Sequence, residues 1–400
     1  MIVLVVNSGS SSLKAQLINT ENGESLANAY CERVGISGSF MTYKNPEKQV
    51  ITKDLPTHKE AFQLVLDTFT SGEIGVISSL DEIKAIGHRL VNFGSKYNKS
   101  IIVDEEVYND LQTCVRFSPL HNVPALTGIK ACMELMPDKK NVAVFDTAFH
   151  STMPQKAYMY AIPYEFYEKH NIRRYGAHGT SHRYIAMKCE ELFGDLKGKK
   201  IISCHLGSGS SLCAIKDGKC VDTSMGYTPL AGVVMGTRSG DVDPSVLKEI
   251  ANVTGKNIDE VTTILNKQSG LLGISGEYSD MRDIENNLDK PRVRLAFDML
   301  VYSIKKYIGA YSAAMGGLDY LVFTAGIGEK SDMVRDAVCS DMEYLGIEID
   351  HEKNSSQNKP FDKIIDYATA GSRVRILRIP TDEEFMIAKD TEQTVLEVKE

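Results

Sequence analysis

The sequence predicts an α/β fold built from two related domains. Three observations support this prediction. The chain has 400 residues, which is more than one ordinary domain holds. Short apolar segments typical of strands alternate with helical patterns. A strand–loop–strand unit at the N-terminus recurs near the middle of the chain. Together these observations favour mixed sheets flanked by helices in both halves.

The first element is a hairpin with a loop of small polar residues. The strand pattern Ile2–Val6 is followed by a Gly/Ser-rich turn over residues 7–12 and a second strand pattern, Leu13–Ile18. Asn22-Gly23 then indicates another turn. Small residues let backbone N–H groups and hydroxyls approach an anion closely, so this loop is a candidate phosphate cradle.

The same plan returns in the second half of the chain. A strand pattern at 201–205 leads into a Gly/Ser turn at 206–211, a strand pattern at 212–216 and a turn at Asp217-Gly218. Ser-Ser-Leu occurs in both units, and the second loop is one residue longer than the first. Duplication of one ancestral unit is the favoured interpretation.

The remaining elements follow from the local patterns. A third glycine loop, Ala325–Glu329, is expected between a strand at 320–324 and a helical stretch at 332–345. We place the domain boundary near residue 150, which gives a first domain over 1–150 and a second over 151–383. Further helices are expected at 59–70, 122–136, 181–193, 244–253, 292–315 and 382–389, and further strands at 83–88, 142–145 and 374–379.

Composition excludes several classes of protein. A net charge of −8, no Trp and 8% aromatic residues argue against a nucleic-acid binder. The longest apolar run near the N-terminus, Ile2–Val6, is too short for a signal peptide or a membrane span. The eight cysteines contain no C-x-x-C pair, which favours reduced thiols over disulfides or structural zinc. A cytoplasmic protein without nucleic-acid or membrane partners is therefore expected.

Common catalytic motifs are absent. The chain has no Walker A sequence, and Leu212 and Ser331 stand where a dinucleotide-binding motif would need its third glycine. There is no nucleophile elbow of the form G-x-S-x-G and no zinc-protease motif. P-loop, Rossmann, hydrolase and metalloprotease sites are all disfavoured.

Other polar residues stand in unusual contexts that fit one chemistry. Arg89 ends a strand pattern, Asp146 follows another, and Arg238 lies between glycines. Two arginines can clamp a carboxylate or a phosphoryl group. An Asp and a Glu, such as Glu383, suit magnesium. With Gly/Ser loops for phosphates, this set fits phosphoryl transfer.

These residues and loops resemble those of the acetate kinase family, and the resemblance extends over nearly the whole chain. The motifs that carry the resemblance are residues 5–14, 87–89, 145–150, 174–176, 178–182, 235–238 and 323–329.

The resemblance implies a fold. It implies two duplicated actin-like domains of the ribonuclease H-like type, as in the acetate and sugar kinase/heat-shock ATPase/actin superfamily. An active-site cleft between the domains is expected, with a C-terminal helix, about 384–400, that returns to the first domain.

The resemblance also implies an activity, which is reversible phosphoryl transfer from ATP to acetate, giving acetyl phosphate and ADP. Mg²⁺ is the expected metal, with Mn²⁺ as an alternative, and the expected assembly is a cytoplasmic homodimer.

Residue roles are carried over motif by motif. The catalytic positions are Asp146, His178 and Arg238, the carboxylate-binding position is Arg89, and the metal positions are Asn7 and Glu383. The acyl pocket maps to Val91, Leu120, Ala177 and Pro229. The nucleotide positions are Ser10, Ser12, Lys14, His205, Leu206, Gly207, Ser208, Gly209, Asp280, Met281, Arg282, Gly326, Ile327, Gly328, Glu329 and Lys330.

Three positions depart from the family pattern. Ala177 stands where the family usually has Phe, so the acyl pocket is either larger or refilled by another side chain. Ser208 and Lys330 stand in the nucleotide loops where the family commonly has Asn, and they bear on whether the phosphoryl donor is ATP or pyrophosphate. The intact Gly326-Ile327-Gly328 favours ATP.

Two alternatives to an acetate kinase stay open. The first is a propionate or short-chain fatty-acid kinase, because one methylene is worth only about 1–3 kcal/mol of discrimination. The second is a non-catalytic ATP-binding protein of the same superfamily. The retained Arg89, Asp146, His178 and Arg238 argue against this second alternative.

Overall fold

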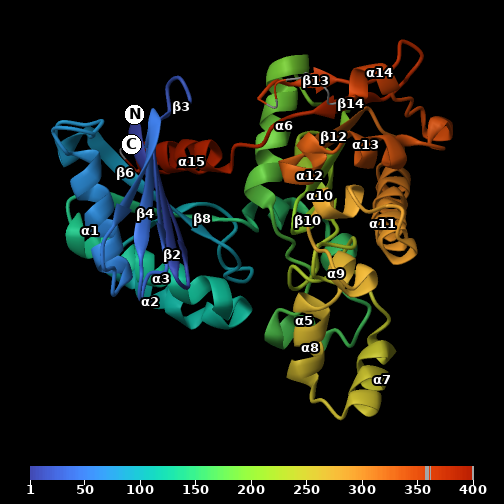
Figure 1. Cartoon of the computed structure of the whole chain (residues 1–400), viewed down its shortest axis with the longest axis horizontal. Helices are drawn as coiled ribbons and strands as arrows, with labels where there is room; N and C mark the ends of the chain where they lie inside the picture. The colour runs from blue at the N-terminus through green and yellow to red at the C-terminus, as the bar shows by residue number, and fades with distance from the viewer. Residues whose placement is uncertain (356–359, 361, 399–400) are drawn as a thin grey trace. The chain divides into compact units, whose positions relative to one another are not determined.

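The computed structural model describes residues 1–355, 360 and 362–398, except for the side chains of residues 119 and 120. It divides into two compact units (Figure 1). The first unit comprises Met1–Ala148 and Asp382–Glu400, and the second comprises Phe149–Thr381.

The first unit contains a mixed eight-stranded sheet in the order β5-β4-β3-β2-β1-β6-β8-β7. The central strand β1 pairs antiparallel with β2 and parallel with β6, and β6 pairs parallel with β8. The strands are β1 (Ile2–Gly9), β2 (Ser12–Asn19), β3 (Glu24–Glu32), β4 (Phe40–Asn45), β5 (Glu47–Thr52), β6 (Ile83–Leu90), β7 (Ile101–Val103) and β8 (Lys140–Phe145).

Helices cover both faces of this sheet because both faces are apolar. Successive side chains of β1 point to opposite faces. Leu4 and Val6 belong to a core cluster shared with α1 (His58–Phe69), whereas Val3 and Val5 belong to one shared with α15 (Glu383–Glu397). The helix α3 (Pro119–Leu135) also packs on β1 and β6, and α2 (Glu105–Thr113) contacts β7.

The C-terminal helix α15 lies against the N-terminal strands, as the red helix beside the blue strands in Figure 1 shows. Its close contact with β6 requires a glycine. A Cβ added at Gly87 would lie 2.2 Å from Oγ1 of Thr391 and 2.9 Å from Cγ2 of Ile387. The helix begins at Glu383, where the Asp382 side chain accepts a hydrogen bond from the Phe385 N–H group at 2.8 Å. The position of Glu383 therefore depends on the packing at Gly87.

The second unit contains a six-stranded sheet in the order β11-β10-β9-β12-β14-β13. Here β9 pairs antiparallel with β10 and parallel with β12, which in turn pairs parallel with β14. The strands are β9 (Lys200–Leu206), β10 (Ser210–Lys216), β11 (Lys219–Thr223), β12 (Tyr320–Thr324), β13 (Ile365–Asp366) and β14 (Arg375–Arg378).

The two sheets share one strand order, β3-β2-β1-β6-β8 in the first unit and β11-β10-β9-β12-β14 in the second. In each, three antiparallel strands are followed by two parallel ones. The first hairpin loop has two residues between its strands, and the second has three, over 207–209. The predicted α/β fold, the duplication and the one-residue insertion are confirmed.

The long helix α11 (Pro291–Met315) supports the second sheet. Its Phe297, Leu300 and Ile304 share a core cluster with residues of β9 and β12. The other helices of this unit are α4 (Gln155–Tyr158), α5 (Glu165–His170), α6 (Gly179–Phe193), α7 (Pro244–Thr254), α8 (Ile258–Lys267), α9 (Gly270–Ser275), α10 (Met281–Glu285), α12 (Ala325–Lys330), α13 (Asp332–Cys339) and α14 (His351–Asn354).

Three predicted elements differ from the structure. The helix expected at 382–389 continues to Glu397 as α15, in line with the C-terminal helix that the family resemblance implies. The expected loop Ala325–Glu329 is the short helix α12, in which the Glu329 carboxylate accepts a hydrogen bond from the Ala325 N–H group at 2.8 Å. The expected helix at 332–345 stops at Cys339, because Ser340 adopts an extended backbone with ψ of 143°, and a 3₁₀ turn follows at Glu343–Leu345. Local turn geometry ends this helix earlier than its apolar pattern suggests.

Among the described residues, no helix is both long enough and apolar enough to cross a membrane. All eight cysteines are buried free thiols.

We predict that Gly87→Ala lowers the free energy of unfolding by about 1–3 kcal/mol, because the added methyl group collides with α15. Urea unfolding of the purified variant measures this loss. Gly72→Ala is the control, because a Cβ at Gly72 meets nothing within 4 Å. Equal unfolding midpoints for the two variants would contradict the packing argument.

Candidate active site

Three predicted site residues lie at one edge of the first sheet. Asn7 lies near the end of β1, Arg89 near the end of β6, and Asp146 directly after β8. Val6 pairs with His88, and Arg89 pairs with Val144, so the parallel strands end together. The carboxyl ends of such strands are where α/β sheets usually hold ligands.

An ion-pair network connects these strand ends to α15. Arg89 Nη2 lies 3.1 Å from Asp146 Oδ2, and Arg89 Nε lies 3.7 Å from Glu383 Oε2. The Asp146 side chain is buried, and its negative charge is the main reason that the pKa of Arg89 is raised. Lys14 donates a hydrogen bond to Glu384, so the predicted phosphate-binding lysine is held in an ion pair.

The Glu383 carboxyl group has a pKa raised from 4.5 to about 7. Burial is the largest cause, and the charges of Asp146 and Glu384 add to it, although Arg89 and Lys14 act in the opposite direction. Three carboxylates thus face two cationic side chains. A divalent cation would relieve the repulsion between the carboxylates, and carboxylate and amide oxygens are the ligands that Mg²⁺ prefers. The residue types at Asn7 and Glu383 therefore fit the expected metal.

The hairpin loop between β1 and β2 is held in place by its own contacts. His58 Nε2 lies 2.7 Å from the Gly9 carbonyl oxygen. A Cβ at Gly9 would lie 2.6 Å from Ser12 Oγ, so the glycine allows the serine to fold over the turn. The predicted nucleotide contact Ser10 is exposed, and Ser12 is half-buried. The loop therefore presents small polar groups to solvent.

The second unit places His178 in a chain of histidines and serines. His178 precedes α6 with a left-handed backbone, φ of 56°. Its Nδ1 lies 2.9 Å from Ser211 Oγ, which lies 2.8 Å from His182 Nε2. His182 Nδ1 in turn lies 2.9 Å from Ser203 Oγ. The His205 ring stacks on His178 with centroids 4.0 Å apart.

Arg238 lies beside the same glycine loop as His178. A Cβ at Gly209 would lie 3.2 Å from Arg238 Nη1 and 3.7 Å from His178 Nε2. The missing side chain therefore leaves both groups access to the loop. Arg238 Nη1 donates a hydrogen bond to the Pro229 carbonyl at 3.2 Å, and burial lowers the pKa of its guanidinium, which stays charged at neutral pH.

A pocket of about 420 Å³ in the second unit collects half of the predicted nucleotide positions. A Cβ at Gly326 would meet nothing within 4 Å, so this glycine leaves open space in the pocket. The predicted residues that line this pocket are Gly207, Ser208, Asp280, Met281, Arg282, Gly326, Ile327 and Lys330. The pocket is also lined by Ser279, Glu285 and Ser331, which were not predicted from the sequence.

Other predicted nucleotide residues of this unit pack in the core or form hydrogen bonds within the protein, and so hold the nucleotide loops in place. The Leu206 side chain belongs to the core, and His205 Nδ1 lies 2.8 Å from Ser181 Oγ. A Cβ at Gly328 would lie 3.3 Å from the Phe323 backbone, so this glycine allows close packing. Glu329 also accepts a hydrogen bond from the Thr381 N–H group at 3.0 Å. These residues, with Gly209, do not line the pocket.

The predicted acyl positions are divided between the units. Ala177 is buried and forms a small apolar cluster with Met225 and Met235, so two methionine side chains pack beside it. Val91 is buried in the first unit. Leu120 lies in α3, and its side chain is outside the described part of the chain.

We predict that metal-free Glu383→Gln is more stable than the natural protein at about pH 8. A raised carboxyl pKa means that the folded state binds more protons between pH 4.5 and about 7, so the stability contributed by Glu383 falls as pH rises through this range. Gln mimics the protonated form, so the difference in Tm should shrink as pH falls toward 4.5.

Thermal unfolding between about pH 4.5 and 8, with and without Mg²⁺, measures this effect. Mg²⁺ should raise the Tm of the natural protein and leave that of Glu383→Gln unchanged. The matched control is Glu397→Gln, at the exposed end of the same helix. A difference in Tm that stays constant with pH would contradict the prediction.

Comparison with known proteins identifies the family. The model of the acetokinase family matches residues 2–389. An acetate kinase of Clostridium botulinum is 52% identical over 397 residues, covering 98% of this chain and 99% of that protein. The crystal structure of Porphyromonas gingivalis acetate kinase has a TM-score of 0.94 and 44% identity, covering 98% of this chain and 99% of that one. A propionate kinase from Francisella tularensis has a TM-score of 0.90 and 39% identity over the same shares. The chain therefore belongs to the acetokinase family.

Proposed function

We propose that this chain is an acetate kinase that transfers a phosphoryl group reversibly between ATP and acetate. The observation that carries the proposal is the position of Arg89, which holds ion pairs with Asp146 and Glu383 at the carboxyl ends of β1, β6 and β8. A binding protein for ATP alone would have no need of such a carboxylate-recognising group. Membership of the acetokinase family supports the same activity.

Arg89 binds the substrate carboxylate in this mechanism. Its planar fork suits two parallel hydrogen bonds to a carboxylate. Acetate is already ionised at pH 7, so the reaction needs no general base. The buried Asp146 orients the fork through its 3.1 Å contact with Nη2. Acetate oxygen is thereby presented as the nucleophile.

His178 and Arg238 stabilise the phosphoryl group during transfer. A phosphoryl group in flight carries charge on three equatorial oxygens, which N–H donors can neutralise. If Ser211 donates its hydroxyl proton to His178 Nδ1, then Nε2 of His178 carries a proton toward Gly209. The chain through His182 and Ser203 supports this orientation. His178 thus acts as a donor rather than as a base.

Nucleotide and metal complete the proposal. ATP is assigned to the pocket around Gly207, Asp280 and Gly326. Mg²⁺, held by Asn7 and Glu383, would neutralise phosphate charge when bound. We propose direct in-line transfer, in which acetate attacks the γ-phosphorus as the bond to ADP breaks. The chain is further proposed to act in the cytoplasm.

The first test measures acyl phosphate as its hydroxamate with ATP and Mg²⁺. Arg238→Ala should lower kcat by about 10²–10³-fold, because one transition-state donor is lost. Arg89→Ala should raise KM for acetate and also lower the Tm, because Asp146 would be left buried without this partner. The control is Arg294→Ala on the exposed face of α11, which should behave as the natural protein. ATP binding without any acyl phosphate would overturn the proposal, and a kinetically competent phospho-enzyme at Glu383 would overturn direct transfer.

The same assay with acetate, propionate and butyrate tests the acid. Because Met225 and Met235 already pack beside Ala177, we expect acetate to have the highest kcat/KM. Ala177→Phe should then destabilise this cluster by overpacking. A higher kcat/KM for propionate in the natural protein, reversed in Ala177→Phe, would instead favour the short-chain acid kinase.

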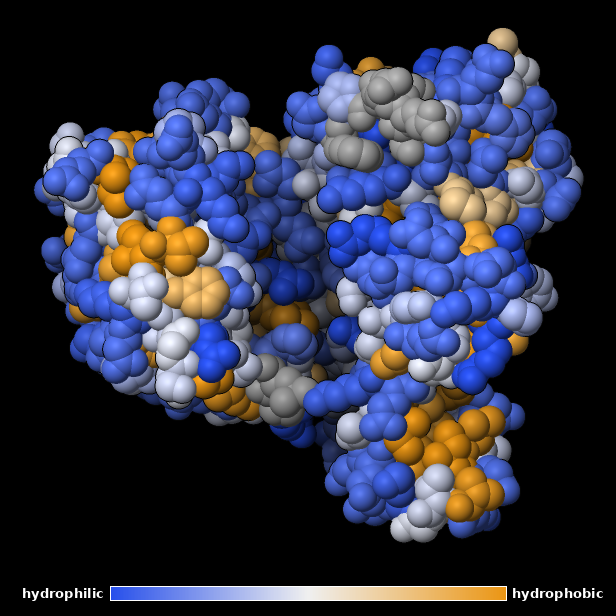
Figure 2. All heavy atoms as spheres, in the orientation of Figure 1, coloured by the Kyte–Doolittle hydropathy of each residue, from blue (hydrophilic) through white to orange (hydrophobic). Residues whose placement is uncertain are grey.

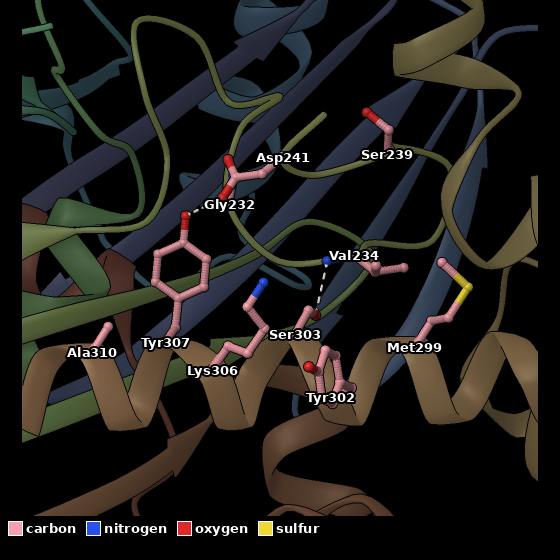
Figure 3. A pocket seen from close by; sticks show the side chains of 10 residues that line it. All are labelled: Gly232, Val234, Ser239, Asp241, Met299, Tyr302, Ser303, Lys306, Tyr307 and Ala310. Atoms are coloured by element: carbon pink, nitrogen blue, oxygen red, sulfur yellow. Dashed lines mark hydrogen bonds between the residues drawn. The ribbon is translucent and has the colours of Figure 1, made fainter. Parts of the chain in front are cut away.

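We also propose a homodimer, on the evidence of exposed apolar side chains in the second unit. Val253 at the end of α7 and Ile258 at the start of α8 are 73% and 60% exposed, and Figure 2 shows an apolar patch over these helices. On α11, the exposed Met299 and Tyr302 line a second hollow, of about 320 Å³, beside Asp241 (Figure 3). Stable dimers commonly bury such surface, about 800 Å² per partner.

Light scattering of the purified protein tests this assembly. The natural chain should have twice the monomer mass, and Tyr302→Asp or Val253→Asp should shift it toward the monomer, because a charge would be buried at the interface. Lys48→Asp, on an exposed residue of β5 in the first unit, controls for the charge change. A monomeric natural protein would contradict the proposal.

A further inference from the structure

Three potential soft-metal ligands converge in the interior of the second unit. His150 lies in the 3₁₀ segment Ala148–Thr152, near the start of the second unit. Cys213 lies on β10, and Cys220 lies on β11. His150 Nδ1 lies 3.2 Å from Cys220 Sγ and 4.0 Å from Cys213 Sγ, and the two sulfur atoms are 3.4 Å apart. All three residues are buried. The phosphoryl-transfer proposal uses none of these three side chains.

The protonation of His150 follows from its second contact. Nε2 of the ring lies 2.9 Å from the Ala177 carbonyl oxygen, which can only accept a hydrogen bond. Nε2 therefore carries the proton, and in the neutral ring Nδ1 presents its lone pair toward the two sulfur atoms. Metal-binding histidines commonly have this arrangement, with one nitrogen toward the metal and the other donating to a carbonyl.

The spacing of the three atoms suits one tetrahedral ion. With Zn–S of about 2.3 Å and Zn–N of about 2.05 Å, tetrahedral angles separate two sulfurs by about 3.8 Å and a sulfur and a nitrogen by about 3.5 Å. The observed separations of 3.4, 3.2 and 4.0 Å differ from these values by about half an ångström or less. The ligand triangle is therefore close to its bound geometry.

We propose that His150, Cys213 and Cys220 form a binding site for Zn²⁺. On binding, the two thiols release their protons to solvent, two Zn–S bonds and one Zn–N bond form, and the metal keeps its oxidation state. Two thiolates and Zn²⁺ sum to zero charge, which suits a fully buried position. A water molecule can complete the fourth position.

The site would stabilise the region that carries His178. Cys213 lies two residues after Ser211, which contacts His178, and His150 holds the carbonyl of the preceding residue, Ala177. The ion would also fasten the edge strand β11 to β10 and to the 3₁₀ segment. Because all three ligands are buried, Zn²⁺ must enter during folding or when the β10–β11 hairpin opens.

The test is metal binding by the whole chain after refolding with a chelator present. Zn²⁺ or Co²⁺ is added in the presence of excess Mg²⁺, which occupies oxygen-ligand sites. We expect one tightly bound ion per chain by elemental analysis, and thiolate-to-cobalt charge-transfer absorption with Co²⁺. Zn²⁺ should also raise the Tm, because it binds the folded state.

Cys213→Ala, Cys220→Ala and His150→Ala should each weaken binding by more than the roughly 10–100-fold that loss of a supporting contact costs. Cys189→Ala, a buried cysteine of α6 in the same unit, should keep the full affinity. Cys220→Ser guards against variants that fail to fold, and circular dichroism of each metal-free variant verifies folding. Absence of a tightly bound ion, equal binding by Cys220→Ala and Cys189→Ala, or oxidation of Cys213 and Cys220 to a disulfide without metal uptake would overturn the site.

Discussion

The ion pair between Arg89 and the buried Asp146 is the interaction on which the first half of the candidate site depends. A buried carboxylate without a partner would be costly, so Asp146 needs the guanidinium beside it. The parallel register of β6 and β8 places the two residues together. The same guanidinium faces Glu383, and Glu383 reaches it only because Gly87 allows α15 to lie on β6. The strand register and the glycine at position 87 thus decide which carboxylates lie beside Arg89.

These parts were predictable because they depend on local sequence. Strand patterns that end in polar residues drew attention to Arg89 and Asp146, whereas the role of Asn7 was implied only by the resemblance to the family. The repeated Gly/Ser hairpin indicated the duplicated sheets. The helix α8 was missed although its signal is present, since Asn257 and Glu260 form a capping box. The helix α12 has no such signal, because its two glycines disfavour a helix and a side-chain contact from Glu329 outweighs that preference.

The remaining contacts join residues that are far apart in the sequence. His178 touches Ser211, 33 residues later, and His150 touches Cys220, 70 residues later. No periodicity within one segment reveals such contacts, because they arise from the pairing of β9, β10 and β11 and from the position of α6. The absence of a C-x-x-C pair argued against zinc, but cross-strand neighbours can bring two cysteines together at other spacings.

Ala177 shows why a departure from a family pattern needs its structural surroundings. On sequence alone, the small side chain suggests a larger acyl pocket as readily as a refilled one. In the folded chain, Met225 and Met235 pack against Ala177, as expected if other side chains take the place of the family's Phe. The Ala177 carbonyl meanwhile bonds His150 through the backbone, so this contact does not depend on the identity of the side chain. The backbone anchor of the residue before His178 is therefore independent of side-chain size, whereas the packing against Met225 and Met235 is not.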